Sequence, residues 1–262
     1  MEIINDKTKG FINQGFEHEY ALVRATNEKK VKDLNPFLQD TIRTIFKEIK
    51  DEDIIYSKLC NRFAKPDISI KINDKIKYLS IKSGRTNSAH FEKIREFIVF
   101  LESLDISKET IETILLFHYG DGTIDGSGEK RMLFDELFPI MHQRIQKANQ
   151  ELNTKELTEI FLDRFVFDGV KKSYLSVDYI YYGDINYGVV CSKYDIKRFV
   201  LNRNYNHIRT LHFGPLTFQP FLRDIDFKSH NPQKREYMQI KWHYILSDLE
   251  RIQSYKKINE MI

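Results

Sequence analysis

The sequence predicts an α/β protein with a mixed central β-sheet flanked by helices, followed by a β-rich and basic C-terminal part. Two runs rich in β-branched and aromatic residues, 65–72 and 76–82, are separated by the polar pair Asn73-Asp74, which predicts an antiparallel hairpin. Segments with helical spacing of apolar residues lie on both sides of this hairpin. The continuous apolar run Thr113–Phe117 is expected to form a further, buried strand.

The predicted helices follow from apolar spacing and from residues suited to helix ends. Residues 16–25 show helical spacing, and Pro36 suits the first turn of a second helix. Asn87-Ser88 is a capping pair in front of a third helix, residues 89–104. Two more helices are expected at 133–151 and 155–165.

The second half of the chain changes character after these helices. Its expected strands are 174–182, 187–191 and 209–218. The turn Asp184–Asn186 separates the first two, and Gly214-Pro215 is expected to kink the third. Residues 236–252 fit either a strand or a helix, because the period of their apolar residues is ambiguous.

Charge is distributed unevenly along the chain. The formal net charge is +3, yet residues 197–262 hold 12 Lys and Arg against 6 Asp and Glu. A basic segment suits a polyanionic partner, although an ordinary solvated surface would show the same excess. We expect a core of residues 1–152 and an elaboration of residues 153–262. The elaboration is expected to take part in DNA recognition and not to fold independently, because no linker of Pro, Gly or Ser separates it.

The composition is typical of a globular protein in water, with 41% hydrophobic and 30% charged residues. No apolar run approaches the length of a membrane span, and the first residues lack the layout of a secretion signal. Cys60 and Cys191 are expected to be reduced core thiols. We therefore expect a cytoplasmic protein with no membrane partner and no organic cofactor.

One pair of residues points to a specific chemistry. Asp67 begins the first strand of the hairpin and Lys82 ends the second, so that pairing brings both side chains to the same end of the sheet. Pro66 fixes the backbone before the carboxylate, and strand alternation places Ser80 on the same face as Lys82. A carboxylate beside an ammonium can hold a divalent metal and activate water next to a phosphodiester. Isolated charged residues at strand ends are otherwise ordinary solvated termini.

This spacing resembles the core motif of the PD-(D/E)XK nuclease superfamily, in which Pro-Asp and a hairpin are followed by an acid, any residue and Lys. The resemblance covers residues 15–118, in the order helix, strand, strand, helix, strand. It departs at Ser80, which stands at the position of the acid and cannot supply a charged metal ligand. A branch of restriction endonucleases with Ser-x-Lys takes this acid from the following helix. That branch implies Glu92 here, with Glu96 as the next choice.

Glu19 is the other candidate for the second acid. It shares the apolar face of its predicted helix with Phe16 and Val23, whereas Glu17 is expected to face solvent. A carboxylate turned toward the core needs a metal or a cation as its partner. Many members of the superfamily carry a glutamate on the helix before the hairpin. A salt bridge to a core arginine would explain Glu19 almost equally well, so the choice between Glu92 and Glu19 stays open.

Two regions are expected to contact nucleic acid. The loop after the second strand offers polar side chains and helix N-terminal N–H groups that suit a phosphate, although a capped turn would use the same residues. Further along, cations are interleaved with aromatic residues, a combination that suits a nucleic-acid surface. The predicted contacts are Arg85, Asn87, Ser88, Arg209, Arg235 and Lys241.

The resemblance implies a divalent-metal-dependent endonuclease of the restriction or phage-defence type, which hydrolyses DNA phosphodiester bonds. Asp67 with Glu92 or Glu19 would hold Mg²⁺, for which Mn²⁺ would substitute. Lys82 would orient the attacking water, and Ser80 would be a secondary contact. Such enzymes often act on double-stranded DNA as homodimers. Two alternatives stay open: a non-catalytic nucleic-acid-binding protein on a degenerate nuclease fold, and a partner-binding protein whose motif matches are chance.

Overall fold

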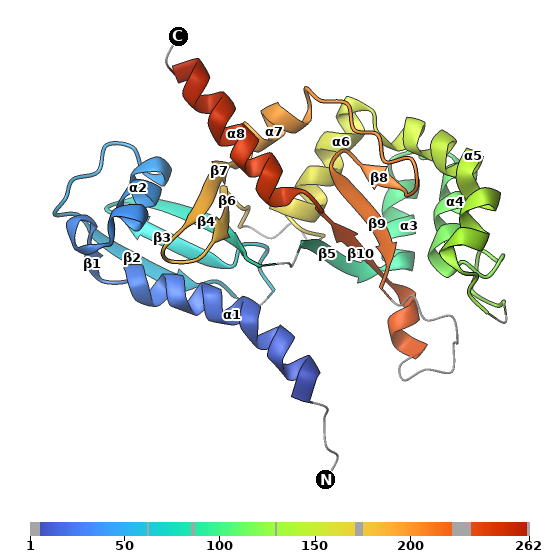
Figure 1. Ribbon diagram of the computed structural model, residues 1–262, viewed down its shortest axis with the longest axis horizontal. Coiled ribbons are helices and arrows are strands. Elements are labelled where there is room, and N and C mark those ends of the chain that lie inside the picture. Colours follow the sequence, from blue (N-terminus) through green and yellow to red (C-terminus); the bar gives the residue numbers. More distant parts are fainter. Residues whose placement is uncertain are drawn as a thin grey trace. The chain divides into compact units, whose positions relative to one another are not determined.

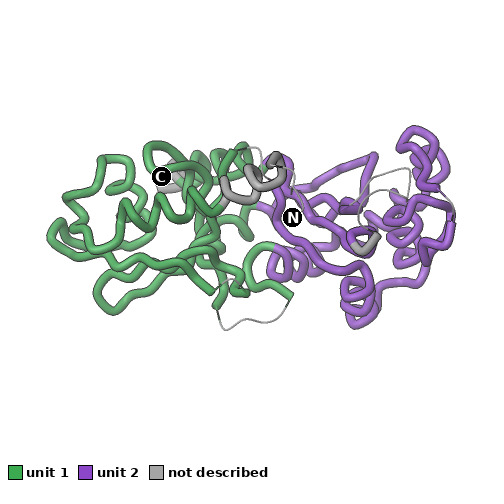
Figure 2. Tube along the Cα trace, turned by 90° about the horizontal axis from the view of Figure 1, so that it is seen from below, with its two compact units in different colours: residues 1–86, 166–199, 245–262 green, residues 87–165, 200–244 purple. Residues whose placement is uncertain are grey.

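A computed structural model describes residues 6–61, 63–84, 87–128, 130–170, 175–221 and 232–260. The chain forms two compact units, each assembled from separate segments (Figure 2). Unit 1 comprises residues 1–86, 166–199 and 245–262, and unit 2 comprises residues 87–165 and 200–244. Within the described residues, every helix is too short or too polar to cross a membrane.

Unit 1 is built on a six-stranded sheet with the order β1-β2-β3-β4-β6-β7 (Figure 1). Neighbouring strands are antiparallel except β4 and β6, which are parallel, so the sheet is mixed. The predicted α/β class with a mixed central sheet is therefore confirmed. The strands are β1 (Lys29–Lys30), β2 (Ile54–Leu59), β3 (Ile68–Ile72), β4 (Lys75–Lys82), β6 (Tyr179–Gly183) and β7 (Gly188–Ser192).

The predicted hairpin is formed by β3 and β4, and its turn fixes the register. Ile72 pairs with Lys75, which leaves only Asn73 and Asp74 in the turn. Asn73 has a φ of 52°, a left-handed conformation that asparagine tolerates better than most residues with a side chain. A two-residue turn sets which side chains face each other along the whole hairpin.

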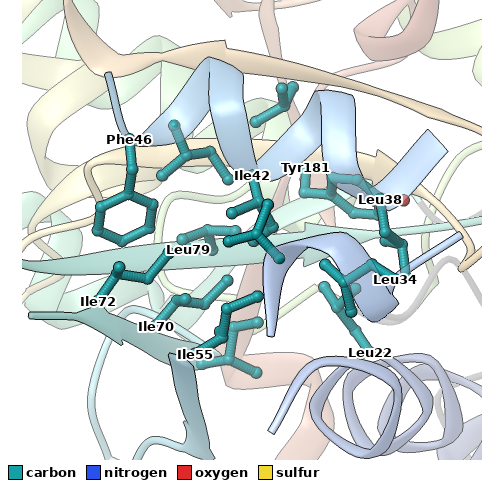
Figure 3. Packing of buried hydrophobic residues seen from close by; sticks show 14 of the residues in the cluster. Leu22, Leu34, Leu38, Ile42, Phe46, Ile55, Ile70, Ile72, Leu79 and Tyr181 are labelled. Atoms are coloured by element: carbon teal, nitrogen blue, oxygen red, sulfur yellow. The ribbon is translucent and has the colours of Figure 1, made fainter. Parts of the chain in front are cut away.

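One face of this sheet is covered by α1 (Asp6–Thr26) and α2 (Pro36–Ile45). Figure 3 shows Leu22 of α1 and Leu38 and Ile42 of α2 packed over Ile70 and Leu79 of the hairpin. All five side chains are buried, and each contributes about 1.5–3 kcal/mol to the free energy of folding. The sheet face that points to these helices is therefore fixed by hydrophobic packing.

Local signals set the position of α2 as the sequence predicts. The side chain of Asn35 accepts a hydrogen bond from the N–H of Leu38 at 2.8 Å, and Pro36 occupies the first helical position. Two later helices complete unit 1, α7 (Lys193–Val200) and α8 (Ile245–Glu260). α8 packs on β7, where the Cys191 thiol donates to the carbonyl of Leu249 at 3.4 Å.

Unit 2 contains an antiparallel four-stranded sheet with the order β5-β10-β9-β8. Its strands are β5 (Ser88–Lys93), β8 (His212–Phe213), β9 (Leu216–Pro220) and β10 (Tyr237–Lys241). Its helices are α3 (Ile94–Glu102), α4 (Lys108–Tyr119), α5 (Phe134–Leu152) and α6 (Lys155–Leu162). The core is aromatic: the rings of Phe161 and Phe213 lie 4.4 Å apart, and Phe97, Phe165 and Phe218 are also fully buried.

The predicted helix at 89–104 is only partly present. Residues 88–93 form strand β5, and the helix α3 begins at Ile94. β5 pairs with β10, more than 140 residues later, in the register Phe91↔Gln239. Such pairing is invisible to a local sequence pattern, because the partner strand decides whether an alternating segment becomes a strand.

The predicted strand Thr113–Phe117 is wrong, since these residues lie within helix α4. The side chain of Ser107 accepts a hydrogen bond from the N–H of Thr110 at 3.3 Å and caps the helix. Gly120 ends it in the left-handed conformation, with a φ of 64°. The apolar run is therefore the middle of a capped helix whose two ends the sequence also displays.

The remaining differences concern the C-terminal half. Residues 209–218 contain two strands, β8 and β9, which pair as a hairpin around Gly214-Pro215. Residues 236–252 contain both alternatives in succession, β10 and then the first turns of α8. The expected border after residue 152 falls at the end of α5, inside unit 2, and both units draw on separate stretches of the chain.

Candidate functional site

The site begins at the open end of the β3–β4 hairpin in unit 1. Asp67 directly precedes β3, and its N–H donates to the carbonyl of Leu79 at 2.8 Å. Its carbonyl accepts from the N–H of Cys60 at 2.9 Å, so backbone bonds hold Asp67 on both sides. The hairpin register places Asp67 opposite Ser80.

Two donors from β4 fix the Asp67 carboxylate. The Ser80 hydroxyl donates to Oδ2 at 3.0 Å, and the N–H of Ile81 donates to the same oxygen at 2.6 Å. Among the described residues, Oδ1 accepts no hydrogen bond. The carboxylate is therefore oriented through one oxygen, while the other oxygen is available to a ligand.

Ser80 thus has a structural contact with the predicted acid. Its side chain is 4% exposed and shares a face of β4 with Lys82, two residues later. The neighbours Leu79 and Ile81 face the hydrophobic core and hold the strand in this orientation. Lys82 is the last residue of β4, so the hairpin register places it at the same end of the hairpin as Asp67, and it is half-buried.

Glu19 of α1 belongs to the same group of charges. The pKa of its carboxyl is raised from 4.5 to about 7, chiefly by burial and then by the charge of Asp67, while the charge of Lys82 lowers it. Glu19 lies one helical turn before Leu22, whose side chain is buried in the sheet core. The structure therefore brings Glu19, Asp67 and Lys82 within electrostatic reach of one another.

Glu92 has a different environment. It lies in β5 of unit 2 and is 4% exposed. Arg164 contacts both oxygens of its carboxylate, with Nη2 at 2.6 Å from Oε2 and Nε at 3.3 Å from Oε1. The Arg164 guanidinium also lies 3.9 Å from the ring centre of Phe100. Glu92 is the acid of an internal ion pair rather than part of a helix N-terminus, and Glu96 is exposed in the first turn of α3.

The predicted phosphate-binding loop is also placed differently. Arg85 lies outside the described residues. The carbonyl of Asn87 accepts from the N–H of Trp242 at 2.7 Å, and the hydroxyl of Ser88 accepts from Gln239 at 2.9 Å. Asn87 and Ser88 therefore connect the start of β5 to β10, and the expectation that they cap a helix is wrong.

The three predicted basic contacts divide into one internal and two outer residues. Arg235 is paired at 2.8 Å with the carboxylate of Asp121, whose side chain is fully buried, and its guanidinium carbon lies 5.6 Å from the ring centre of Tyr119. This pairing explains Arg235 as a support of the loop after α4. Arg209 is 65% exposed, and Lys241 lies half-buried on β10.

Cys60 is a neighbour of the site that the sequence pattern did not single out. Its pKa is raised by burial, then by the charge of Asp67, with a smaller contribution from Glu19. Because Cys60 directly follows β2, its place beside Asp67 depends on the β2–β3 register. That register was the missing information, since the sequence pattern identified only the β3–β4 hairpin.

The donor set limits which metal the site could hold. Within the described residues, His, Cys, Asp and Glu side chains form no group of three or more that could hold a metal ion. Two carboxylates near each other, one with a raised pKa, are a pair whose repulsion a cation would relieve. Mg²⁺ commonly binds through one or two carboxylates and completes its shell with water and substrate phosphates. Glu19 and Asp67 fit that pattern.

The sequence was compared with protein-family models and with curated proteins. No protein-family model matches the chain, and no curated protein matches it significantly.

Proposed function

We propose that unit 1 is a metal-dependent nuclease that hydrolyses phosphodiester bonds in DNA. The observation that supports this most is the grouping of Glu19, Asp67 and Lys82 at one end of the β3–β4 hairpin. Two carboxylates and an ammonium are the minimal set for holding a cation and offsetting phosphate charge. The proposal assigns the second acid to Glu19, because Arg164 already neutralises Glu92.

The order of elements gives partial support to a restriction-endonuclease-like core. Helix α1 and the hairpin follow the order that the resemblance implies, and β6 later joins β4 in parallel. Beyond the hairpin the order differs in part, because strand β5 precedes α3 within the expected helix 89–104, and helix α4 stands where a strand was expected. We therefore propose the restriction-endonuclease-like core for unit 1 alone. Most of unit 2 is inserted in the sequence between β4 and β6.

Each residue of the group has a role that its contacts allow. Mg²⁺, when bound, supplies charge to polarise the scissile phosphate and lowers the pKa of water. Ser80 and the N–H of Ile81 hold Asp67 through Oδ2, which leaves Oδ1 for the cation. Lys82 orients the attacking water and offsets negative charge that develops on the phosphate. Glu19, once ionised, is the second carboxylate.

Cleavage of DNA by the 262-residue chain tests this proposal. Supercoiled plasmid and linear duplex are incubated with Mg²⁺ or Mn²⁺, and with EDTA as the metal-free control. We expect metal-dependent cleavage that falls about 100-fold or more in Asp67→Asn and in Lys82→Ala. The matched controls are Asp74→Asn in the hairpin turn and Lys71→Ala on β3, both exposed and outside the site. Equal activity of site and control variants would sink the assignment.

The substrate form and assembly belong to the same proposal. By resemblance to restriction enzymes, the substrate is double-stranded DNA and the active form is a homodimer that cuts both strands. Light scattering of the protein with and without duplex measures the assembly. A linear product made directly from supercoiled plasmid would support paired cuts, whereas nicked plasmid alone would favour a monomer.

A nucleic-acid-binding protein without catalysis is the second candidate. It is favoured by Ser80, which holds a hydroxyl where the motif has an acid, and by the engagement of Glu92 with Arg164. This reading predicts salt-sensitive DNA binding without cleavage under any metal. The cleavage assay above, run beside a binding titration, separates the two candidates.

A further inference from the structure

Unit 2 contains a cavity of about 510 Å³ beside β9 and the start of α5. All of its lining residues belong to unit 2. Its volume falls in the range of about 300–1,000 Å³ that is typical of sites for small ligands. The cavity is separate from Glu19, Asp67 and Lys82, so it offers a binding function of its own.

Aromatic side chains form much of the wall of this cavity. Phe117 and Phe218 belong to the core, whereas Phe134 is 43% exposed and Tyr244 is 67% exposed. Large rings exposed singly need no explanation, but two at one cavity provide surfaces for a planar ligand. Proteins that bind single-stranded nucleic acid use such rings to stack unpaired bases.

Arg209 adds a cation to the lining. Its guanidinium carbon lies 5.2 Å from the ring centre of Phe134 and 5.3 Å from that of Phe138. Asp135 is 3.5 Å away, and the Arg209 side chain remains 65% exposed. A guanidinium held against rings can contact a phosphate or stack on a base. The charge of the lining therefore suits an anionic ligand with a planar group.

Arg131 also lines the cavity, but its guanidinium is bound to the protein backbone. Its guanidinium donates to the carbonyl of Phe117 at 3.0 Å and to that of Tyr119 at 2.9 Å. These bonds satisfy carbonyls at the end of α4, where a helix leaves them without partners. Arg131 therefore shapes the wall, and Arg209 is the cation assigned to the ligand.

A polar edge completes the lining. Nε2 of Gln219 lies 2.9 Å from Nε2 of His243, whose Nδ1 lies 3.0 Å from the Asn87 amide. A neutral imidazole has one donor and one acceptor nitrogen, so His243 accepts from the NH2 group of one of these amides and donates to the oxygen of the other. Among the described residues, the second amide atom of Gln219 has no hydrogen-bond partner. Amides of Asn and Gln recognise the edges of bases.

Another cavity of unit 2, of about 530 Å³, lacks this combination. Its amides serve the fold: Asn149 accepts from the N–H of His212 at 3.1 Å, and Asn153 accepts from the N–H of Gly214 at 2.6 Å. Tyr205 is the only Phe, Tyr or Trp among its described lining residues. The stacking surfaces therefore belong to the cavity beside β9.

We infer that the cavity beside β9 receives one unstacked base of a nucleic-acid strand. Phe134 and Tyr244 stack on the base, Gln219 contacts its edge, and Arg209 contacts the adjoining phosphate. The inference rests on the proposed function for the identity of the partner. It goes beyond that function by assigning unit 2 a nucleotide site that the cleavage chemistry does not require.

The first test uses single-stranded DNA labelled with fluorescein and measures affinity by anisotropy. Tyr244→Ala and Phe134→Ala remove exposed rings, so both variants are expected to fold. We expect each to weaken binding by about 5- to 150-fold, because stacking of one base is worth about 1–3 kcal/mol. The matched control is Tyr194→Ala, which removes a ring that is 70% exposed on α7 of unit 1. Wild-type affinity in both cavity variants would overturn the inference, even if the protein cleaves DNA.

A second test separates this inference from the nuclease proposal. Saturation-transfer NMR with adenosine and thymidine 5′-monophosphates is run on Asp67→Asn, which is expected not to cleave. Transfer to the base protons that Tyr244→Ala or Gln219→Ala abolishes would support the cavity site, whatever the outcome of the cleavage assay. No saturation transfer to either nucleotide, together with no oligonucleotide binding, would refute it. Cleavage by wild type with unaltered binding in the cavity variants would leave the proposed function standing alone.

Discussion

The Ser80 hydroxyl donates a 3.0 Å hydrogen bond to Oδ2 of Asp67 across the β3–β4 pair. The N–H of Ile81 donates to the same oxygen. Ser80, which stands where the nuclease motif has an acid, therefore holds the carboxylate of Asp67 in place. Glu19 of α1 interacts electrostatically with Asp67 and Lys82, and we propose it as the second acid.

Ser80→Ala is expected to reduce cleavage while the protein stays folded. Loss of one hydrogen bond lowers the free energy of unfolding by about 1 kcal/mol, and Asp67 is then oriented by the Ile81 N–H alone. We expect a decrease in cleavage rate of about tenfold. Ser57→Ala is the control, because Ser57 is a buried serine of β2 bonded to Thr26 at 2.8 Å. A loss of stability in both variants with a loss of cleavage in neither would refute the role of Ser80.

The raised pKa of Glu19 predicts a pH dependence of stability. In the folded metal-free protein the carboxyl has a pKa of about 7 against 4.5, so the folded state binds more protons between these values. The free energy of unfolding should therefore fall as pH rises from 4.5 to 7, and stay lower above pH 7. After allowance for solvent screening of this half-buried group, the contribution is about 1–2 kcal/mol.

Urea unfolding of Glu19→Gln against wild type at pH 5 and pH 8 measures this contribution. We expect the variant to be the more stable protein at pH 8, and the difference to shrink at pH 5. Glu17→Gln, on an exposed position of the same helix, is the control and should show no such change. A pH-independent difference between Glu19→Gln and wild type would contradict the shifted pKa.

The hairpin and its acid could be predicted from the sequence because the signals that determine them are local. Pro66 precedes Asp67, and Asn73 tolerates the left-handed turn that sets the register with Lys75. Once that register is given, alternation alone places Ser80 opposite Asp67. The mixed α/β class follows from the same local periodicities.

The rest of the site required tertiary information. Glu92 lies in a strand because residues 237–241 pair with that segment. Its carboxylate forms an ion pair with Arg164, which is 72 positions later in the sequence. Neither partner can be found from the spacing around Glu92. The error at Thr113–Phe117 is of another kind, since the helix ends at Ser107 and Gly120 are local signals, and an apolar run of this length fits a strand as well as a helix.

The ion pair between Glu92 and Arg164 is expected to matter for folding and not for cleavage. Arg164→Met leaves a buried carboxylate without its cation, which costs about 3–5 kcal/mol. Glu92→Gln with Arg164→Met together should recover much of this loss. Any Glu92→Gln protein that folds should cleave DNA at nearly the wild-type rate, measured under conditions where both are fully folded. Loss of cleavage in a folded Glu92→Gln variant would instead make Glu92 the second acid.

Cys60 provides a chemical probe of the charge around Asp67. Its thiol has a pKa raised by burial and by the negative charge of Asp67, so its thiolate fraction at pH 8 is low. Asp67→Asn removes that charge and should speed alkylation of Cys60 by iodoacetamide, followed by mass spectrometry. Asp74→Asn is the matched control, and Cys191, which is 3% exposed, should react slowly in every variant. The same rate of Cys60 alkylation in Asp67→Asn and wild type would show that the Asp67 charge is too far away to raise the pKa of the thiol. That result would also count against the grouping of charges around Asp67 on which the nuclease proposal rests.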